Sequence, residues 1–143
     1  MTTLAADKKR AFLGQGELFA DLPVVATDII YEGAAVGENS TNGTARPLSG
    51  GDTFMGFAVR RADNASGSAG DVKVRVMTQG FVYLPITGVD NVNDYDATVY
   101  AIDDDSFTLT SSTGHTAIGK LQSYDGTSGY GTVFFQSSAV RSI

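Results

Sequence analysis

Residues 70–85 read GDVKVRVMTQGFVYLP, and their pattern of apolar residues changes at Gly80. Before Gly80, valines alternate with charged residues, which is typical of a strand that has one face in the core and the other in solvent. After Gly80 the inward positions stay apolar, but the other face now carries Phe81 and Tyr83. We therefore expect one strand in two environments, with a bend or bulge permitted by Gly80 where they meet.

Two kinds of neighbour can cover the second face of this strand. One is another part of the same chain, either an N-terminal arm or a second sheet. The other is a neighbouring subunit, since aromatic residues are enriched in subunit interfaces. We assign Phe81 and Tyr83 as candidate subunit contacts and leave both alternatives open.

The composition indicates one domain with many turns. A chain of 143 residues is most simply a single domain that buries its own core. It has no cysteine, and therefore neither a disulfide framework nor a thiolate site. No apolar run reaches the length that spans a bilayer, and no leader segment is recognisable, so we expect neither membrane binding nor secretion.

Short apolar runs recur at regular intervals from Ile29 onward, separated by stretches rich in Gly, Ser, Thr, Asn and Asp. This pattern predicts an all-β fold for residues 29–143, a single small antiparallel β-sandwich or barrel. In the second run, Met55, Phe57 and Val59 should share one face. The expected strands are 29–31, 54–59, 72–76, 81–84, 99–102, 107–109, 117–121 and 133–135.

Residues 1–28 differ from the rest and are interpreted as an N-terminal arm. The four-residue spacing of Leu4, Lys8 and Phe12 favours a short helix that ends at the following glycines. Such a segment is often a disordered terminus. Its apolar residues also suit docking, either on a partner or on the chain's own domain, and both remain open.

The charge is acidic and unevenly distributed. The formal net charge is −6, which argues against nucleic-acid binding. Residues 90–105 hold six aspartates and no basic residue, a charge equal to that net value. The stretch DNVNDYD lacks the ligand spacing of a calcium loop. The consecutive aspartates 103–105 fit a solvated hairpin turn better than a metal site, so we interpret the segment as a solvated face.

The residues for catalysis are few. His115, the single histidine, lies in a predicted loop, and no nucleophile motif accompanies it. We therefore expect no enzymatic activity, no catalytic residue, no cofactor and no metal.

Several ordered stretches together resemble one protein family. They are IYEGAAVG, then ARPLSGGDTFMGFA, then ADNASGSAGDVKVRV, followed by a glycine and an apolar Leu-Pro. These resemble the cement or decoration proteins of tailed-phage heads over roughly residues 29 to 135. The matching positions are Gly51, Asp52, Gly56 and Ala58, then 69–76, then 80–85.

The resemblance implies a structural protein of the virion. It would be assembled in the host cytoplasm, bind the outer surface of the expanded phage capsid as a homotrimer, and clamp neighbouring subunits of the major capsid protein. From the composition of the arm, we assign its cations and first apolar residues as candidate capsid contacts. These are Lys8, Lys9, Arg10, Phe12 and Leu13.

The alternative is a carbohydrate-binding or adhesive β-sandwich module on the virion surface. Tyr95, Tyr124 and Tyr130 are available for stacking on a sugar ring, although the chain has no tryptophan, the usual platform for such stacking. A reproducible ligand class on a glycan array would favour this alternative.

Overall fold

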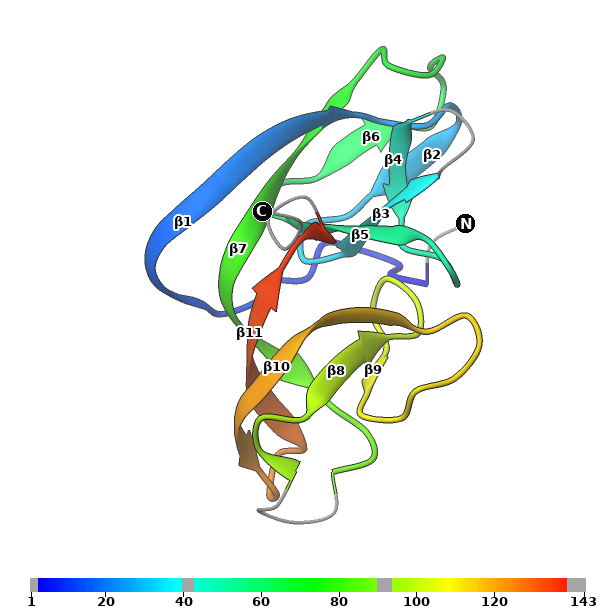
Figure 1. The fold of residues 1–143 in the computed structure, drawn as a ribbon. Coiled ribbons are helices and arrows are strands. Elements are labelled where there is room, and N and C mark those ends of the chain that lie inside the picture. The colour runs from blue at the N-terminus through cyan, green and yellow to red at the C-terminus, as the bar shows by residue number, and fades with distance from the viewer. Residues whose placement is uncertain (1–2, 40–42, 90–93, 139–143) are drawn as a thin grey trace.

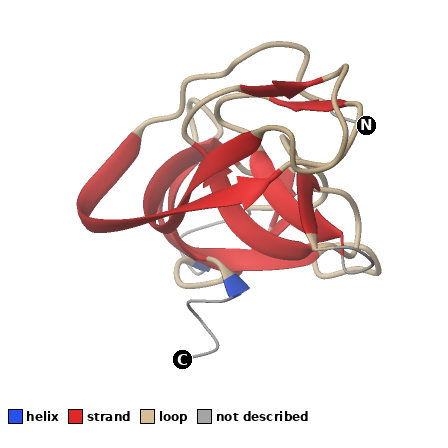
Figure 2. Cartoon of the chain, turned by 90° about the horizontal axis from the view of Figure 1, so that it is seen from above, coloured by secondary structure: helices blue, strands red, loops and turns tan. Residues whose placement is uncertain are grey.

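The structure, a computed structural model, describes residues 3–39, 43–89 and 94–138. It confirms the all-β prediction, with antiparallel strands that curl into a half-barrel (Figures 1 and 2). The strands are β1 (Phe12–Pro23), β2 (Asp28–Ile30), β3 (Ala35–Asn39), β4 (Thr44–Pro47), β5 (Thr53–Ala58), β6 (Ala62–Asn64), β7 (Lys73–Pro85), β8 (Thr98–Ala101), β9 (Phe107–Thr108), β10 (Thr116–Asp125) and β11 (Tyr130–Gln136).

The long strand β7 joins the two halves of the main sheet. The strand order is β4-β3-β5-β7-β11-β10-β8-β9, and β1 also pairs with β7. On one edge, β7 pairs first with β5, at Met77 and Val76, and then with β11, from Gln79 to Pro85. β2 and β6 form a separate two-stranded sheet. Figure 1 shows β1 and β7 running side by side along one flank.

The two runs predicted around Gly80 form one continuous strand, β7. Val74 and Val76 before Gly80, and Val82 and Leu84 after it, are all buried, as the alternation predicts. Pairing with β11 continues through Gly80 without a register shift. The irregularity lies instead on the partner β1, whose register shifts on both sides of Leu18.

β5 departs from the predicted alternation. Phe54 and Phe57 both enter the main core, whereas Met55 packs against the second cluster. The reason is a bulge: Gly37 pairs with Phe54 and the preceding residue of β3 pairs with Gly56, so Met55 is the extra residue. Gly56 has φ +125°, and a Cβ there would lie 2.3 Å from the Met77 carbonyl oxygen. Only glycine fits this crossing of β5 and β7.

The N-terminal segment docks on its own chain. Residues 3–11 form no helix, so the predicted short helix is wrong. Leu4 is buried in the second core cluster, and the Lys8 N–H donates to the Glu32 carbonyl at 2.8 Å. Tertiary contacts outweigh the weak helical spacing here.

β4 and β6 form in stretches that were expected to be turns, and β3 is a further strand that was not expected. Buried side chains form two clusters. The main core lies between β5, β7, β8, β10 and β11, and the second cluster includes Val36 of β3 and both Val74 and Val76 of β7. Within the described residues, no helix is long and apolar enough to cross a membrane.

Candidate functional site

Four aromatic side chains line the outer side of β7 and β11, and we call this set the aromatic face. Phe81 lies directly opposite Phe134, with ring centroids 5.1 Å apart. Tyr83 stacks on Tyr130 at 5.2 Å, with 26° between the ring planes. Cross-strand aromatic pairs of this kind stabilise a sheet and also present a broad, stiff surface.

Where β7 pairs with β11, the outward positions of both strands carry no charge. All of them are half-buried, which means that the sheet itself covers them only in part. An aromatic, uncharged and partly exposed surface is typical of the centre of a protein interface. The outward residues are Gln79, Phe81, Tyr83 and Pro85 on β7 and Tyr130, Thr132, Phe134 and Gln136 on β11.

The position of β1 does not show what covers the aromatic face. β1 pairs edge to edge with β7, Leu13 opposite Phe81, and thus extends the sheet sideways. A strand added at an edge pairs with the backbone of its neighbour and places its own side chains beside the neighbour's outward side chains, not on top of them. The assignment of Phe81 and Tyr83 as subunit contacts therefore stands as a hypothesis.

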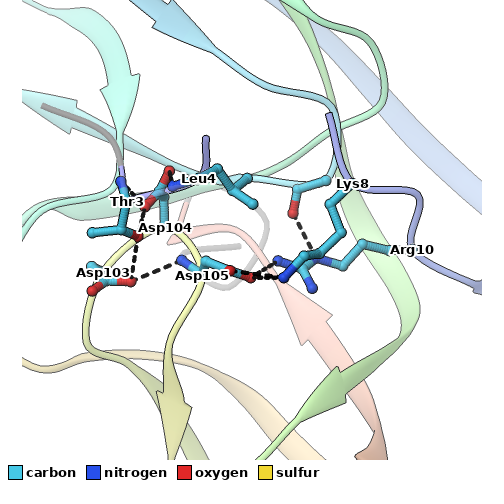
Figure 3. Close-up of polar contacts among 8 residues, drawn as sticks. Thr3, Leu4, Lys8, Arg10, Asp103, Asp104 and Asp105 are labelled. Carbon is cyan, nitrogen blue, oxygen red and sulfur yellow. Dashed lines mark hydrogen bonds and ion pairs between the residues drawn. The ribbon is translucent and has the colours of Figure 1, made fainter. Parts of the chain in front are cut away.

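A separate, polar site lies around the turn between β8 and β9, where it holds the N-terminal segment in place (Figure 3). The Asp105 carboxylate accepts hydrogen bonds from Lys8 Nζ at 2.8 Å and from Arg10 Nη2 at 2.6 Å. Arg10 Nε also donates to the Gly33 carbonyl at 2.6 Å. The guanidinium lies over the Phe107 ring, 5.5 Å from its centroid. Arg10 is therefore held on several sides.

The electrostatics of this site favour the ionised carboxylate. Burial by itself raises the pKa of Asp105, but hydrogen bonds from Lys8 and Arg10, together with their charges, outweigh burial and hold that pKa below its ordinary value. The neighbouring Asp104 is 1% exposed and accepts a hydrogen bond from the Thr3 N–H at 3.0 Å. The interpretation of 103–105 as a solvated face is wrong, because these aspartates anchor the N-terminal segment.

This arrangement changes the set of candidate capsid contacts. The Arg10 side chain is 2% exposed and the Lys8 side chain is paired with Asp105, so neither points freely outward. The Lys9 side chain is 87% exposed, with only a surface pair to Glu32. The side chains of Phe12 and Leu13 lie outside the described residues, although their backbones belong to β1.

Asp52 of the Gly-Asp pair, part of the quoted resemblance, has a structural setting. Its buried carboxylate accepts hydrogen bonds from Arg46 Nε at 2.9 Å, from Arg46 Nη2 at 2.6 Å and from the Ser49 N–H. The hydrogen bonds to Asp52 raise the pKa of Arg46. The carboxylate thereby ties β4 to the turn that precedes β5.

The positions considered for catalysis and metal binding are not gathered into a site. His115 is a surface residue whose Nδ1 lies 2.8 Å from the Thr110 carbonyl oxygen. Residues 90–93 of DNVNDYD lie outside the described residues. In the part of the chain that the structure describes, no three His, Asp or Glu side chains group as a metal site.

The tyrosines considered for sugar binding do not share one surface. Tyr124 pairs in register with Gly131 and packs against the main core. Tyr130, one position earlier, therefore points to the opposite face of the sheet, where it stacks on Tyr83. Tyr95 is exposed in the turn before β8. Only Tyr130 belongs to the aromatic face.

The β11 half of the aromatic face was not assigned from the sequence, although a signal was present. In the stretch YGTVFF, Val133 and Phe135 are the inward positions, and Tyr130 and Phe134 supply a second apolar face. Phe81 was singled out because it is an apolar residue at an outward position of an alternating strand, and the same criterion identifies Tyr130 and Phe134.

No protein-family model matches the sequence, and no curated protein matches it.

Proposed function

We propose that this protein is a non-enzymatic structural protein of a phage virion, which binds the outer surface of the expanded capsid and stabilises it. The observation that carries the proposal is the aromatic face, the uncharged and half-buried surface on β7 and β11. A second copy of this chain is its proposed occupant. Copies with a net charge of −6 repel one another, so they associate best through a surface without charge.

Association into a trimer would give the protein its mechanical effect. A trimer can contact several major capsid subunits at once, and each further contact forms at a high effective concentration. Binding only the expanded lattice stabilises that lattice, by about 2.7 kcal/mol per site when free protein exceeds the Kd a hundredfold. Modest individual contacts are therefore sufficient.

Lys9 is the proposed cationic contact with the capsid. Its ammonium is exposed, whereas Lys8 and Arg10 are used within the chain. Phe12 and Leu13 remain in the proposal as apolar contacts from the same segment. Lys9→Glu should weaken capsid binding. Ser111→Glu, which adds a negative charge at an exposed position between β9 and β10, provides the control, whereas Lys120 is unsuitable because it lies opposite Phe134 at the border of the aromatic face.

Co-sedimentation with phage heads tests the proposed function. The purified protein is mixed with expanded and with unexpanded heads of the phage that encodes it. We expect saturable binding to expanded heads alone, together with greater resistance of those heads to heat. Equal binding to both forms, or binding to neither, would contradict the proposal, and a single ligand class on a glycan array would favour the carbohydrate-binding alternative.

A further inference from the structure

A polar hollow of about 280 Å³ lies beside the start of β7. Its walls are the side chains of Arg60, Arg61, Lys73 and Arg75, beside the carboxylate of Asp21. Four of the ten basic residues in an acidic chain thus meet in one place. We call this set the basic hollow.

The fold brings these residues together from three segments. Arg75 of β7 pairs in register with Asp21 of β1, and Lys73 projects from the same side of β7. The Val59 N–H donates to the Arg75 carbonyl at 3.0 Å, so the two arginines that follow Val59 reach the same region. The basic hollow is therefore built on paired backbone at the start of β7.

Aromatic rings support two of the guanidinium groups. Arg61 lies over Tyr31, 5.0 Å from the ring centroid, and Arg75 lies over Phe19 at 4.9 Å. Stacking of this kind limits the directions a guanidinium can take and leaves its N–H groups free for an anion. It lowers the entropy that is lost when a ligand binds.

Most of the positive charge in the basic hollow is not neutralised. Arg75 Nη1 lies 3.5 Å from Asp21 Oδ2, a pair whose side chains are both substantially exposed. Among the residues that the structure describes, no carboxylate forms an ion pair with Arg60, Arg61 or Lys73, and all three are exposed. Like charges gathered at this spacing attract an external anion.

We propose that the basic hollow binds a carboxylate cluster on an acidic segment of a partner protein. Asp21 already places one carboxylate beside Arg75, and guanidinium groups bind carboxylates through paired hydrogen bonds. The exposed Asp63 and Asp71 each lie two residues along the chain from a cation of the hollow. These flanking carboxylates limit the basic surface to a short stretch, which suits a short acidic segment better than the long run of phosphates in a nucleic acid.

This surface is separate from the aromatic face, so its ligand can be tested independently of the capsid role. The probes are an aspartate-rich peptide, a single-stranded DNA oligonucleotide of equal charge, and inorganic phosphate. Each probe is titrated into the purified full chain at low salt and again near 0.15 M salt. At the higher salt the Debye length is about 8 Å, so the attraction between exposed charges is strongly screened. The variants are Arg60→Glu and Lys73→Glu, with Lys120→Glu as the matched charge reversal elsewhere.

We expect saturable binding of the peptide that weakens as salt rises. Arg60→Glu and Lys73→Glu should each reduce its affinity by roughly tenfold, whereas Lys120→Glu should change it by less than about twofold. Circular dichroism verifies that the variants are folded. The proposal is overturned if the peptide does not bind at low salt, if all three reversals weaken it equally, or if the DNA or phosphate alone binds as tightly.

Discussion

Phe81 and Phe134 lie directly opposite each other on β7 and β11, with ring centroids 5.1 Å apart and both rings half-buried. Because the rings point away from the core, a charge introduced here should affect association more than folding. We expect Phe81→Asp to weaken each contact between copies by about 2 kcal/mol or more, the scale of an aromatic residue at an interface centre. Sedimentation velocity across a dilution series measures this loss.

The control for this change is Tyr95→Asp. Tyr95 is 42% exposed, and it lies in the turn before β8, outside the aromatic face. The same charge placed there should leave the oligomer unchanged. If Phe81→Asp keeps the oligomeric state and a native circular dichroism spectrum, the aromatic face does not hold the subunits together.

The pair between Arg10 and Asp105 predicts how firmly the N-terminal segment is held. Asp105→Asn leaves the buried Arg10 cation without its counter-charge, at a cost of about 3 kcal/mol in the free energy of unfolding. Glu32→Gln is the control, because its partner Lys9 is exposed and such surface pairs contribute about 0–1 kcal/mol. Urea denaturation compares the two. Equal effects would show that the pair does not anchor the segment.

The same carboxylate predicts a dependence on pH. The pKa of Asp105 is lower in the folded protein than its ordinary value, so its ionisation stabilises the fold at pH values above about 4. That stabilisation is lost as the pH falls through the ordinary pKa towards the folded one. The free energy of unfolding should therefore fall more steeply in the wild type than in Asp105→Asn between about pH 5 and pH 3. Parallel curves would contradict this.

Gly56 provides a test of the crossing between β5 and β7. Alanine at this position combines a strained backbone, φ +125°, with a Cβ only 2.3 Å from the Met77 carbonyl oxygen. We expect Gly56→Ala to lower the free energy of unfolding by roughly 2–4 kcal/mol. Gly126→Ala is the control, since a Cβ at this position would have nothing within 4 Å. It should change the free energy of unfolding by less than about 0.5 kcal/mol.

Much of the fold could be predicted from period-two patterns. β7 and β11 carry apolar residues on alternate positions, whereas β10 was expected from its short apolar run, and each was found close to its expected place. β1 was not predicted as a strand, because its sequence FLGQGELFADLP has no clear alternation and becomes a strand by pairing with the free edge of β7. The inward position of Phe54 also escaped prediction, since a bulge shifts the alternation by one residue.

The polar site could be predicted less well than the strands. Asp103, Asp104 and Asp105 form a conspicuous acidic run, but a run alone does not tell which carboxylates meet cations. Asp105 lies 95 residues from Arg10 along the chain, and only the curl of the sheet brings them together. Of the aromatic face, only Phe81 and Tyr83 were predicted. The alternation within one strand shows which of its side chains point outward, but it does not show which strand lies beside it.

The mass of the purified protein in solution tests most directly the central claim, that copies of this chain meet at the aromatic face. Sedimentation equilibrium on the wild type and on Phe81→Asp at the same concentrations provides that measurement. We expect about 45 kDa for the wild type, three times the 15.0 kDa of one chain, and 15.0 kDa for the folded variant. A wild-type protein that stays at 15.0 kDa at every concentration, or a variant that stays at 45 kDa, would contradict the claim.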